Sequence, residues 1–435
     1  MFYYVSFLRP PPSIAPLTSP VSFTPQVAND LRTELCPDEH DLFYSWIHEA
    51  DYKTLLCADI LSTRASHSTS VPGKPTKLTT WRPANLYKEI KIPPPPGVQD
   101  GSTWRLAITV NGQHRGHSSA TIDLWHASGP DRETVGKTPF PVVSMPILFS
   151  ARGGRTGLTK HEKIERIYRF SSPGRSIDAT PPRTVRIVEQ TSFDLDKKIW
   201  DSGIGLSAWI LGVINSIPES GHPSLGHEVR EAVLSTTTTV IELGLSICWN
   251  VCGQVSELAF IGTGTGIVSL VIAASRSTAI SEDEDKAKIY ATDLPSALPL
   301  LEHNIEINTP SCFPRRPPIP LALDWDEELP DVIQKTDGAE LIVMADVTYN
   351  TTSFPALVKT LERLVKLSVR SGKQPLLLLG YKERDEAERT LWDMVKEIGI
   401  DFQKVGEREG AGGFPVEIWI ARREQPRRTV LGAQQ

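Results

Sequence analysis

The sequence predicts an α/β fold, a mainly parallel sheet covered by helices on both faces and preceded by a smaller β-rich or α+β module. Two observations lead to this prediction. Strand-like and helix-like segments alternate from about residue 184 onward, and a glycine-rich turn, GTGTG at 262–266, separates a strand-like run from a helix-like run. The chain has 435 residues, which exceeds the usual size of one domain.

Residues 1–150 form the predicted N-terminal module, whose role the sequence does not indicate. Most of the proline runs lie here, at 10–12 and 93–96. The segment 41–56 has apolar residues at helical spacing and predicts a helix. Alternating and β-branched residues predict strands at 103–110, 120–127 and 141–149.

A polar linker is expected at 151–183, followed by the α/β domain at 184–421 and a basic, frayed tail at 422–435. Strands of the domain are predicted at 184–190, 236–243, 288–294, 319–325, 340–347, 374–381 and 416–423. Helices are predicted at 197–215, 266–276, 295–308, 354–368 and 385–399. In such folds, ligands bind at the carboxyl ends of the strands.

Composition argues against several classes of protein. The net charge of −6 and a pI near 6.0 disfavour a nucleic-acid-binding protein, because phosphate contacts need a concentrated basic face. We expect no membrane span and no secretory leader, and therefore a cytoplasmic or nuclear protein. The five cysteines are scattered, and the pair Cys248 and Cys252 has no second pair nearby, so we expect no metal site.

The GTGTG turn lets the backbone pass close to a ligand, and the helix after it begins with free amides that suit an anion. It does not match the dinucleotide fingerprint, since Ile267 and Ser269 stand where a third glycine is needed. Asp293 ends the next strand, where a carboxylate can accept both hydroxyls of a ribose. The alternatives are a tight strand-to-helix connection and a helix cap.

Two further strands end in polar residues. Trp325 can stack on a planar base and Asp324 can bind an exocyclic amino group, although a Trp buried at the sheet edge is the alternative. Asp346 and Tyr349 follow the strand at 340–347, and together they can orient an amine without a metal. Ordinary loop polarity would also place them there.

The motifs WDSG at 200–203, GTGTG, ATDLP with LLEHNIEIN at 291–308, LDW at 323–325 and DVTY at 346–349 resemble those of a known family. The family is the class I S-adenosylmethionine-dependent methyltransferases of family 16, which is rich in protein-lysine methyltransferases. The resemblance covers residues 184–421. It implies a seven-stranded, Rossmann-like methyltransferase sheet and S-adenosyl-L-methionine as cofactor.

The resemblance also assigns roles to residues of this chain. Asp346 and Tyr349 would line the acceptor channel and act in catalysis. Asp293 would bind the ribose of the cofactor. The remaining cofactor contacts that it implies come from Trp200, Asp201, Gly262, Gly264, Gly266, Asp324 and Trp325.

The first motif departs from the family, which has an acidic residue two places before the first glycine, where this chain has Phe260. Joining VIELG at 240–244 to TGTGIVSL at 263–270 restores the pattern, with Glu242 as the acid that contacts the cofactor. We therefore interpret 245–262 as an insertion, either a translated retained intron or a genuine loop. The sequence of the mature transcript distinguishes the two.

The favoured function is an N-methyltransferase acting on a lysine of a protein substrate, with a translation factor or chaperone as the substrate by family analogy. The N-terminal module would help to choose the target, and we expect a monomer. The alternatives are a small-molecule amine N-methyltransferase and a non-catalytic binding protein on the same fold. A nicotinamide-dependent oxidoreductase is less favoured because the third glycine is missing.

Overall fold

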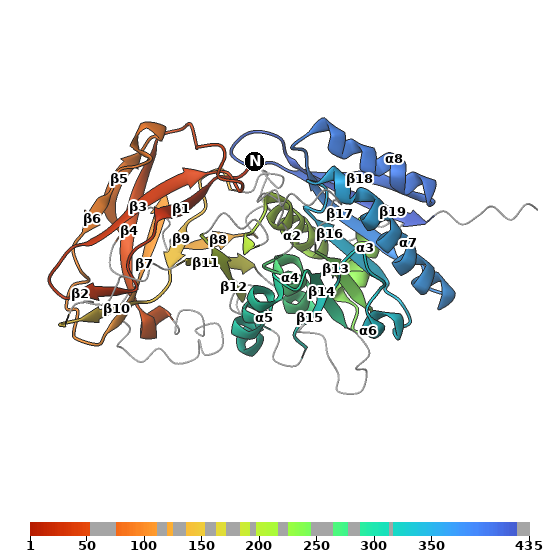
Figure 1. The fold of residues 1–435 in the computed structure, drawn as a ribbon, viewed down its shortest axis with the longest axis horizontal. Coiled ribbons are helices and arrows are strands. Elements are labelled where there is room, and N and C mark those ends of the chain that lie inside the picture. Colours follow the sequence, from red (N-terminus) through yellow and green to blue (C-terminus); the bar gives the residue numbers. More distant parts are fainter. Residues whose placement is uncertain are drawn as a thin grey trace, which may run out of the picture.

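Figure 1 shows the chain as two halves side by side. The N-terminal half, from β1 to β12, is rich in strands, and in the C-terminal half, from α2 to β19, helices surround a sheet. The structure is a computed structural model. It describes residues 1–52, 75–110, 120–124, 136–152, 162–170, 183–191, 197–215, 225–244, 264–276, 288–312 and 316–423.

The C-terminal half is built on a seven-stranded sheet with the order β15-β14-β13-β16-β17-β19-β18. The first five strands in this order are parallel, and the last two run antiparallel to their neighbours. The strands are β13 (Val240–Leu243), β14 (Ile289–Asp293), β15 (Ile319–Ala322), β16 (Leu341–Ala345), β17 (Leu376–Lys382), β18 (Ile400–Arg408) and β19 (Val416–Arg423). The predicted Rossmann-like α/β class is confirmed.

The helices of this half include the predicted ones, and two further α-helices, α3 and α6, are present. They are α2 (Asp201–Asn215), α3 (Leu225–Leu234), α4 (Ile267–Arg276), α5 (Leu298–Cys312), α6 (Asp331–Gln334), α7 (Phe354–Arg370), α8 (Thr390–Glu397) and the short η4 (Thr351–Ser353) and η5 (Glu386–Arg389). The sequence did not predict the four-residue α6, nor α3 and β18. Only two residues of α3 are buried, and exposed polar residues interrupt β18, so neither has a strong apolar pattern.

Two hydrophobic cores lie on opposite faces of this sheet, because successive side chains of a strand point to opposite faces. Val343 of β16 packs with α2, α3 and α4 on one face. Its neighbours Ile342 and Met344 pack with α7 and α8 on the other face. The sheet is therefore covered on both sides, as the continuous apolar strands predict.

The N-terminal half contains two sheets that share a core. The smaller has the order β1-β3-β6, and the larger is nine-stranded along β12-β11-β9-β7-β10-β2, with β4, β5 and β8 paired to it. Phe7 and Phe23 from the first sheet pack with Ile108 and Phe149 from the second. The strands are β1 (Tyr4–Arg9), β2 (Ile14–Pro16), β3 (Val21–Ala28), β4 (His40–His48), β5 (Thr76–Trp81), β6 (Ile90–Ile92), β7 (Thr103–Val110), β8 (Thr121–Asp123), β9 (Val142–Ser144), β10 (Ile147–Ser150), β11 (Lys163–Phe170) and β12 (Arg183–Gln190), with the short helix η1 at Pro83–Asn85.

The helix predicted at 41–56 is wrong for its first part, because His40–His48 form strand β4 between β5 and β7. Leu42 and Trp46 are four residues apart, and that spacing places two side chains on one face of a helix and also on one face of a strand. Both side chains are buried in the N-terminal core. The two aromatic residues between them, Phe43 and Tyr44, favour the strand.

The boundary between the two halves also differs from the prediction. Strand β11 lies inside the predicted linker at 151–183, and β12 includes the first strand predicted for the α/β domain. The two strands pair along their full length in the N-terminal sheet. Val185 and Ile187 of β12 join the core beneath α2 and α4, so one hydrophobic core runs through both halves.

Two asparagines of α5 bind the outer edge of β12. Asn304 accepts a hydrogen bond from the Val188 amide (2.9 Å) and donates to the Val188 carbonyl (3.2 Å). One helical turn later, Asn308 makes the same pair of bonds to Arg186, at 2.8 and 2.7 Å. The two side chains thus satisfy the open edge of the larger sheet, which an exposed strand would leave unpaired.

We expect the double variant Asn304→Ala/Asn308→Ala to lose about 2–4 kcal/mol of unfolding free energy, because it leaves backbone groups at this edge without partners. Chemical denaturation of the full chain measures the loss. Glu306→Ala is the matched control, since Glu306 lies exposed on the same helix, and it should change stability by less than about 0.5 kcal/mol. Equal losses for both variants would show that the asparagines do not hold the edge.

Candidate active site

Gly244 and Gly264, on either side of the predicted insertion, both lie close to the Asp293 carboxylate. The Gly264 amide donates to Asp293 Oδ2 (2.7 Å), and the Gly244 amide donates to the Thr292 carbonyl (2.8 Å). A Cβ on Gly244 would lie 2.9 Å from the same Oδ2 and 2.3 Å from the Thr292 oxygen, so only glycine fits. The predicted insertion 245–262, with Gly262 and Phe260, lies outside the described residues.

Glu242, the displaced acid of the motif, is buried and joins β13 to α4. Its Oε2 accepts the Ser269 amide (2.9 Å), one of the first-turn amides that have no partner within the helix. Burial raises the pKa of Glu242 to about 6, and the bonds from Ser269 oppose this rise. Gly266, at φ +69°, forms the turn before the helix, where a Cβ would meet the Leu301 side chain at 2.4 Å.

Asp293 and the glycine turn beside it suit the adenosyl part of a nucleoside cofactor, because a carboxylate can accept hydrogen bonds from ribose hydroxyls. Asp293 is fully buried at the end of β14, next to the glycine turn, and its second oxygen accepts the Leu294 amide (2.7 Å). Its role toward the cofactor stays a prediction.

Asp324 and Trp325 follow β15, as predicted, but their side chains have different surroundings. Trp325 is fully buried in the core beneath α7, where its carbonyl accepts the Thr360 hydroxyl (3.2 Å). This is the sheet-edge packing that the sequence analysis gave as the alternative to base stacking. Asp324 is half-buried and caps a turn through the Asp326 amide (3.0 Å).

Asp346 lies directly after β16 in the left-handed region, at φ +56°, which non-glycine residues rarely adopt. Its Oδ2 accepts the Ser202 amide at the start of α2 (3.0 Å), and its Oδ1 accepts a bond from Arg384. Only 4% of its surface is exposed. Tyr349, three residues on, packs at the edge of the core on the α7 side of the sheet. The structure therefore places both predicted catalytic residues at the carboxyl edge.

Trp200 and Asp201 reach this edge from the start of α2. The Arg384 guanidinium lies over the Trp200 ring, 5.2 Å from its centroid. Asp201 is fully buried and binds the N-terminal strand region, accepting the Phe2 amide (2.9 Å) and the Tyr4 hydroxyl (2.7 Å). Figure 1 shows the N-terminus between the two halves. The structure thus ties Asp201 to the N-terminal half, and a cofactor contact for it remains a prediction.

Three charged residues at this edge were not predicted from the sequence: Asp30, Lys382 and Arg384. Lys382 binds Asp201 (2.7 Å) and lies 3.5 Å from Asp30, and Arg384 binds Asp30 (2.9 Å) as well as Asp346. The one available signal was KER directly after the strand at 374–381. Asp30 had none, since Lys382 and Arg384, its charged partners, lie more than 350 residues away along the chain.

Burial and ion pairing have opposite effects in this cluster. Burial disfavours the charge on Asp30, but Arg384 and Lys382 outweigh it and lower the Asp30 pKa to about 2. Burial raises the pKa of Asp201, and the neighbouring Asp30 adds to that rise against Lys382. For Lys382, burial lowers the pKa, yet Asp201 and Asp30 raise it above its ordinary value.

Comparison with known protein families identifies the family to which this chain belongs. The sequence profile of one family, described as lysine methyltransferase, matches residues 179–398, which is just over half of the chain. The chain belongs to the lysine methyltransferase family. It is a methyltransferase that uses S-adenosyl-L-methionine to methylate lysine in protein substrates.

Several members of this family are similar to the chain over part of its length. Protein-lysine N-methyltransferase EFM6 of Saccharomyces cerevisiae is 28% identical over 202 residues, 45% of this chain and 71% of the relative. Protein-lysine methyltransferase METTL21E of Bos taurus is 25% identical over 269 residues, 60% and 86%. Among solved structures, Aeropyrum pernix fibrillarin with bound S-adenosyl-L-methionine is 13% identical, with a TM-score of 0.29 over 64% of this chain and 93% of that chain.

We expect Glu242→Gln to make this methyltransferase more stable than the wild type above about pH 6, by about 2 kcal/mol. Glu242 is harder to ionise in the folded than in the unfolded chain. Between about pH 4.5 and pH 6 the unfolded chain therefore loses its proton first, and wild-type stability falls. Gln retains an oxygen for the Ser269 amide and cannot ionise.

Equilibrium unfolding of both proteins at pH 4, 5, 6 and 7 measures this difference. Other titrating groups are common to both chains and cancel. A difference that stays constant across this range would contradict the burial of an ionisable Glu242.

Proposed function

We propose that Asp346 and Tyr349 hold the amine of the acceptor lysine, and that the N-terminal half helps to select the protein that carries it. The observation that supports this is the fixed position of Asp346. Its left-handed backbone and its bond from the Ser202 amide keep the carboxylate at the carboxyl edge. A strained residue that the surrounding structure holds in place is typical of a functional site.

Methyl transfer to lysine needs a neutral amine, whereas lysine in water has a pKa near 10.4. When bound, S-adenosyl-L-methionine supplies a sulfonium-activated methyl group for in-line displacement by the amine. Arg384 binds Asp346 and is 13% exposed, so an ammonium group brought to Asp346 would meet a buried guanidinium. The Arg384 charge opposes the rise in lysine pKa that the Asp346 carboxylate alone would cause, and so favours the neutral amine that attacks.

The N-terminal half supplies groups to the same edge. Asp30 binds Arg384, and Phe2 and Tyr4 bind Asp201 through a backbone amide and a hydroxyl. A substrate that reaches Asp346 therefore passes close to this half of the molecule. A folded protein can contact both halves at once, whereas a small amine cannot, which supports a role of the N-terminal half in substrate choice.

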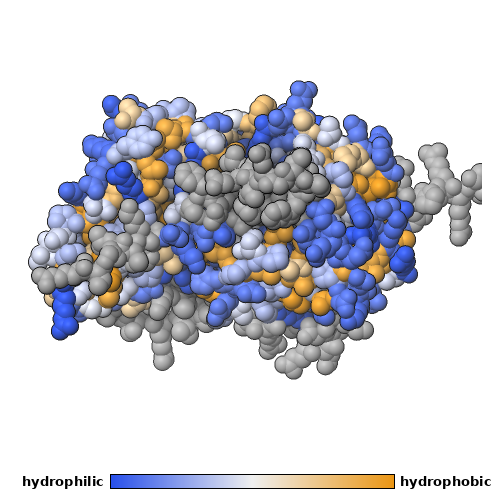
Figure 2. Space-filling view, viewed as in Figure 1, coloured by the Kyte–Doolittle hydropathy of each residue, from blue (hydrophilic) through white to orange (hydrophobic). Residues whose placement is uncertain are grey.

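The substrate we propose is a translation factor or a chaperone, in the cytoplasm or nucleus, methylated by a monomeric enzyme. The charge of −6 supports a protein rather than a nucleic-acid partner. Among the described residues, no helix is long and apolar enough to cross a membrane. Figure 2 shows hydrophobic and hydrophilic residues interspersed on the visible face.

We expect Asp346→Asn to reduce methyl transfer by about two to four orders of magnitude, while affinity for S-adenosyl-L-methionine changes less than threefold. Asn tolerates the left-handed backbone and retains an acceptor, but it has no charge to orient the amine. The assay incubates a cell extract with labelled cofactor and locates the label by mass spectrometry. Calorimetry measures the affinity of the wild-type and Asp346→Asn enzymes for S-adenosyl-L-methionine.

Asp401→Asn is the matched control, because Asp401 is exposed at the opposite end of the sheet, and it should transfer at the wild-type rate. Label in methyl-lysine of a protein band supports the proposal. Label confined to the low-mass fraction would show a small-molecule enzyme, and a parallel loss of cofactor affinity in Asp346→Asn would refute the role of Asp346.

A further inference from the structure

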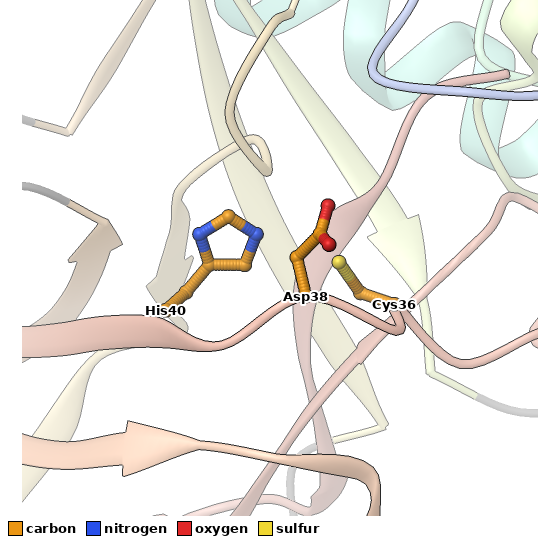
Figure 3. Close-up of side chains that lie close together, drawn as sticks. All are labelled: Cys36, Asp38 and His40. Carbon is orange, nitrogen blue, oxygen red and sulfur yellow. The ribbon is translucent and has the colours of Figure 1, made fainter.

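We propose that Cys36, Asp38 and His40 form a zinc site in the N-terminal half, separate from the methyl-transfer site. Each residue offers one donor atom, a thiol sulfur, a carboxylate oxygen and an imidazole nitrogen, and these atoms all lie within 4.8 Å of one another. Figure 3 shows the three side chains on the same side of the chain segment, with Asp38 between the other two.

The surrounding structure holds both ends of this short segment. The Cys36 amide donates to the Val27 carbonyl at the end of β3 (3.0 Å), and the Cys36 carbonyl accepts the Trp81 indole N–H (3.2 Å). His40 begins β4 and lies opposite the same Trp81 in the strand pair. One buried tryptophan therefore fixes both outer ligands, so little conformational freedom would be lost when a metal binds.

The donor set matches zinc in type and geometry. Thiolate, imidazole and carboxylate are the three protein ligands that zinc prefers, whereas magnesium and calcium take oxygen ligands. Donors around one tetrahedral zinc lie about 3–4 Å apart, given bonds of about 2.0–2.3 Å. The present separations need only side-chain rotation to reach this. Asp38 is exposed and His40 is half-buried, which leaves the fourth position open to water.

Zinc binds imidazole as the neutral ring and a thiol as the thiolate, so a coordinated Cys36 would give up its proton. Nearby Glu39 is paired with Arg82 (2.9 Å) and so does not compete as a ligand.

The site bears on the strand region that reaches the methyl-transfer edge. Cys36 shares a core with Met1, Tyr3 and Val5, and Phe2 and Tyr4 in the same stretch bind Asp201. Zinc would therefore hold the 36–40 segment against the N-terminal strand and stabilise the folded chain by linkage. No metal site was predicted from the sequence, because its cysteines do not form paired ligand motifs. The present set instead contains a single cysteine at alternate positions with Asp and His.

The test uses the full-length chain, freed of metal with a chelator and titrated with Zn²⁺ by calorimetry and with Co²⁺ by absorption. We expect one ion per chain and a thiolate-to-cobalt charge-transfer band. Cys36→Ser should abolish that band, and both Cys36→Ser and His40→Gln should weaken zinc binding by about a hundredfold or more. Zinc should also raise the melting temperature of the wild type and leave that of Cys36→Ser unchanged.

His48→Gln is the matched control, because His48 lies at the other end of the same strand and packs edge to face against Trp104. It should bind zinc as the wild type does. A band that persists in Cys36→Ser would place the metal at another cysteine and overturn the proposal. Failure of the wild type to bind zinc at micromolar concentrations, or equal affinity in His40→Gln, would overturn it as well.

Discussion

The buried carboxylate of Asp201 determines how the two halves of this methyltransferase meet. Asp201 is fully buried at the start of α2, and it binds Lys382, the Phe2 amide and the Tyr4 hydroxyl together. A buried carboxylate is costly unless such partners satisfy it. The N-terminal strand region must therefore lie at the carboxyl edge of the C-terminal sheet, where the candidate acceptor site is.

Strand β12 and helix α5 also connect the two halves. Strand β12 is part of the larger N-terminal sheet, yet Val185 and Ile187 lie in the core of the C-terminal half. Asn304 and Asn308 bind its backbone from α5. The family motif LLEHNIEIN thus has a structural use in this chain, since its two asparagines connect the methyltransferase sheet to its neighbour.

The sequence predicted most of the C-terminal half because its buried strands are continuous apolar runs that alternate with helix-like segments. It also placed Glu242 in the first motif, and the structure brings Gly244 and Gly264 to the same carboxylate of Asp293. It did not predict Asp30, Lys382 and Arg384 as a cluster. These residues meet only through long-range folding, and no local pattern records a pairing such as Asp30 with Arg384.

The most direct test of this account is a double-mutant cycle of Asp30→Asn and Arg384→Gln, read by equilibrium unfolding of the full chain. If the two halves share one buried charge cluster, the substitutions should couple by about 1–3 kcal/mol, with a single unfolding transition. Losses that add within about 0.5 kcal/mol, or two separate transitions, would contradict it. They would show two independent domains that merely touch.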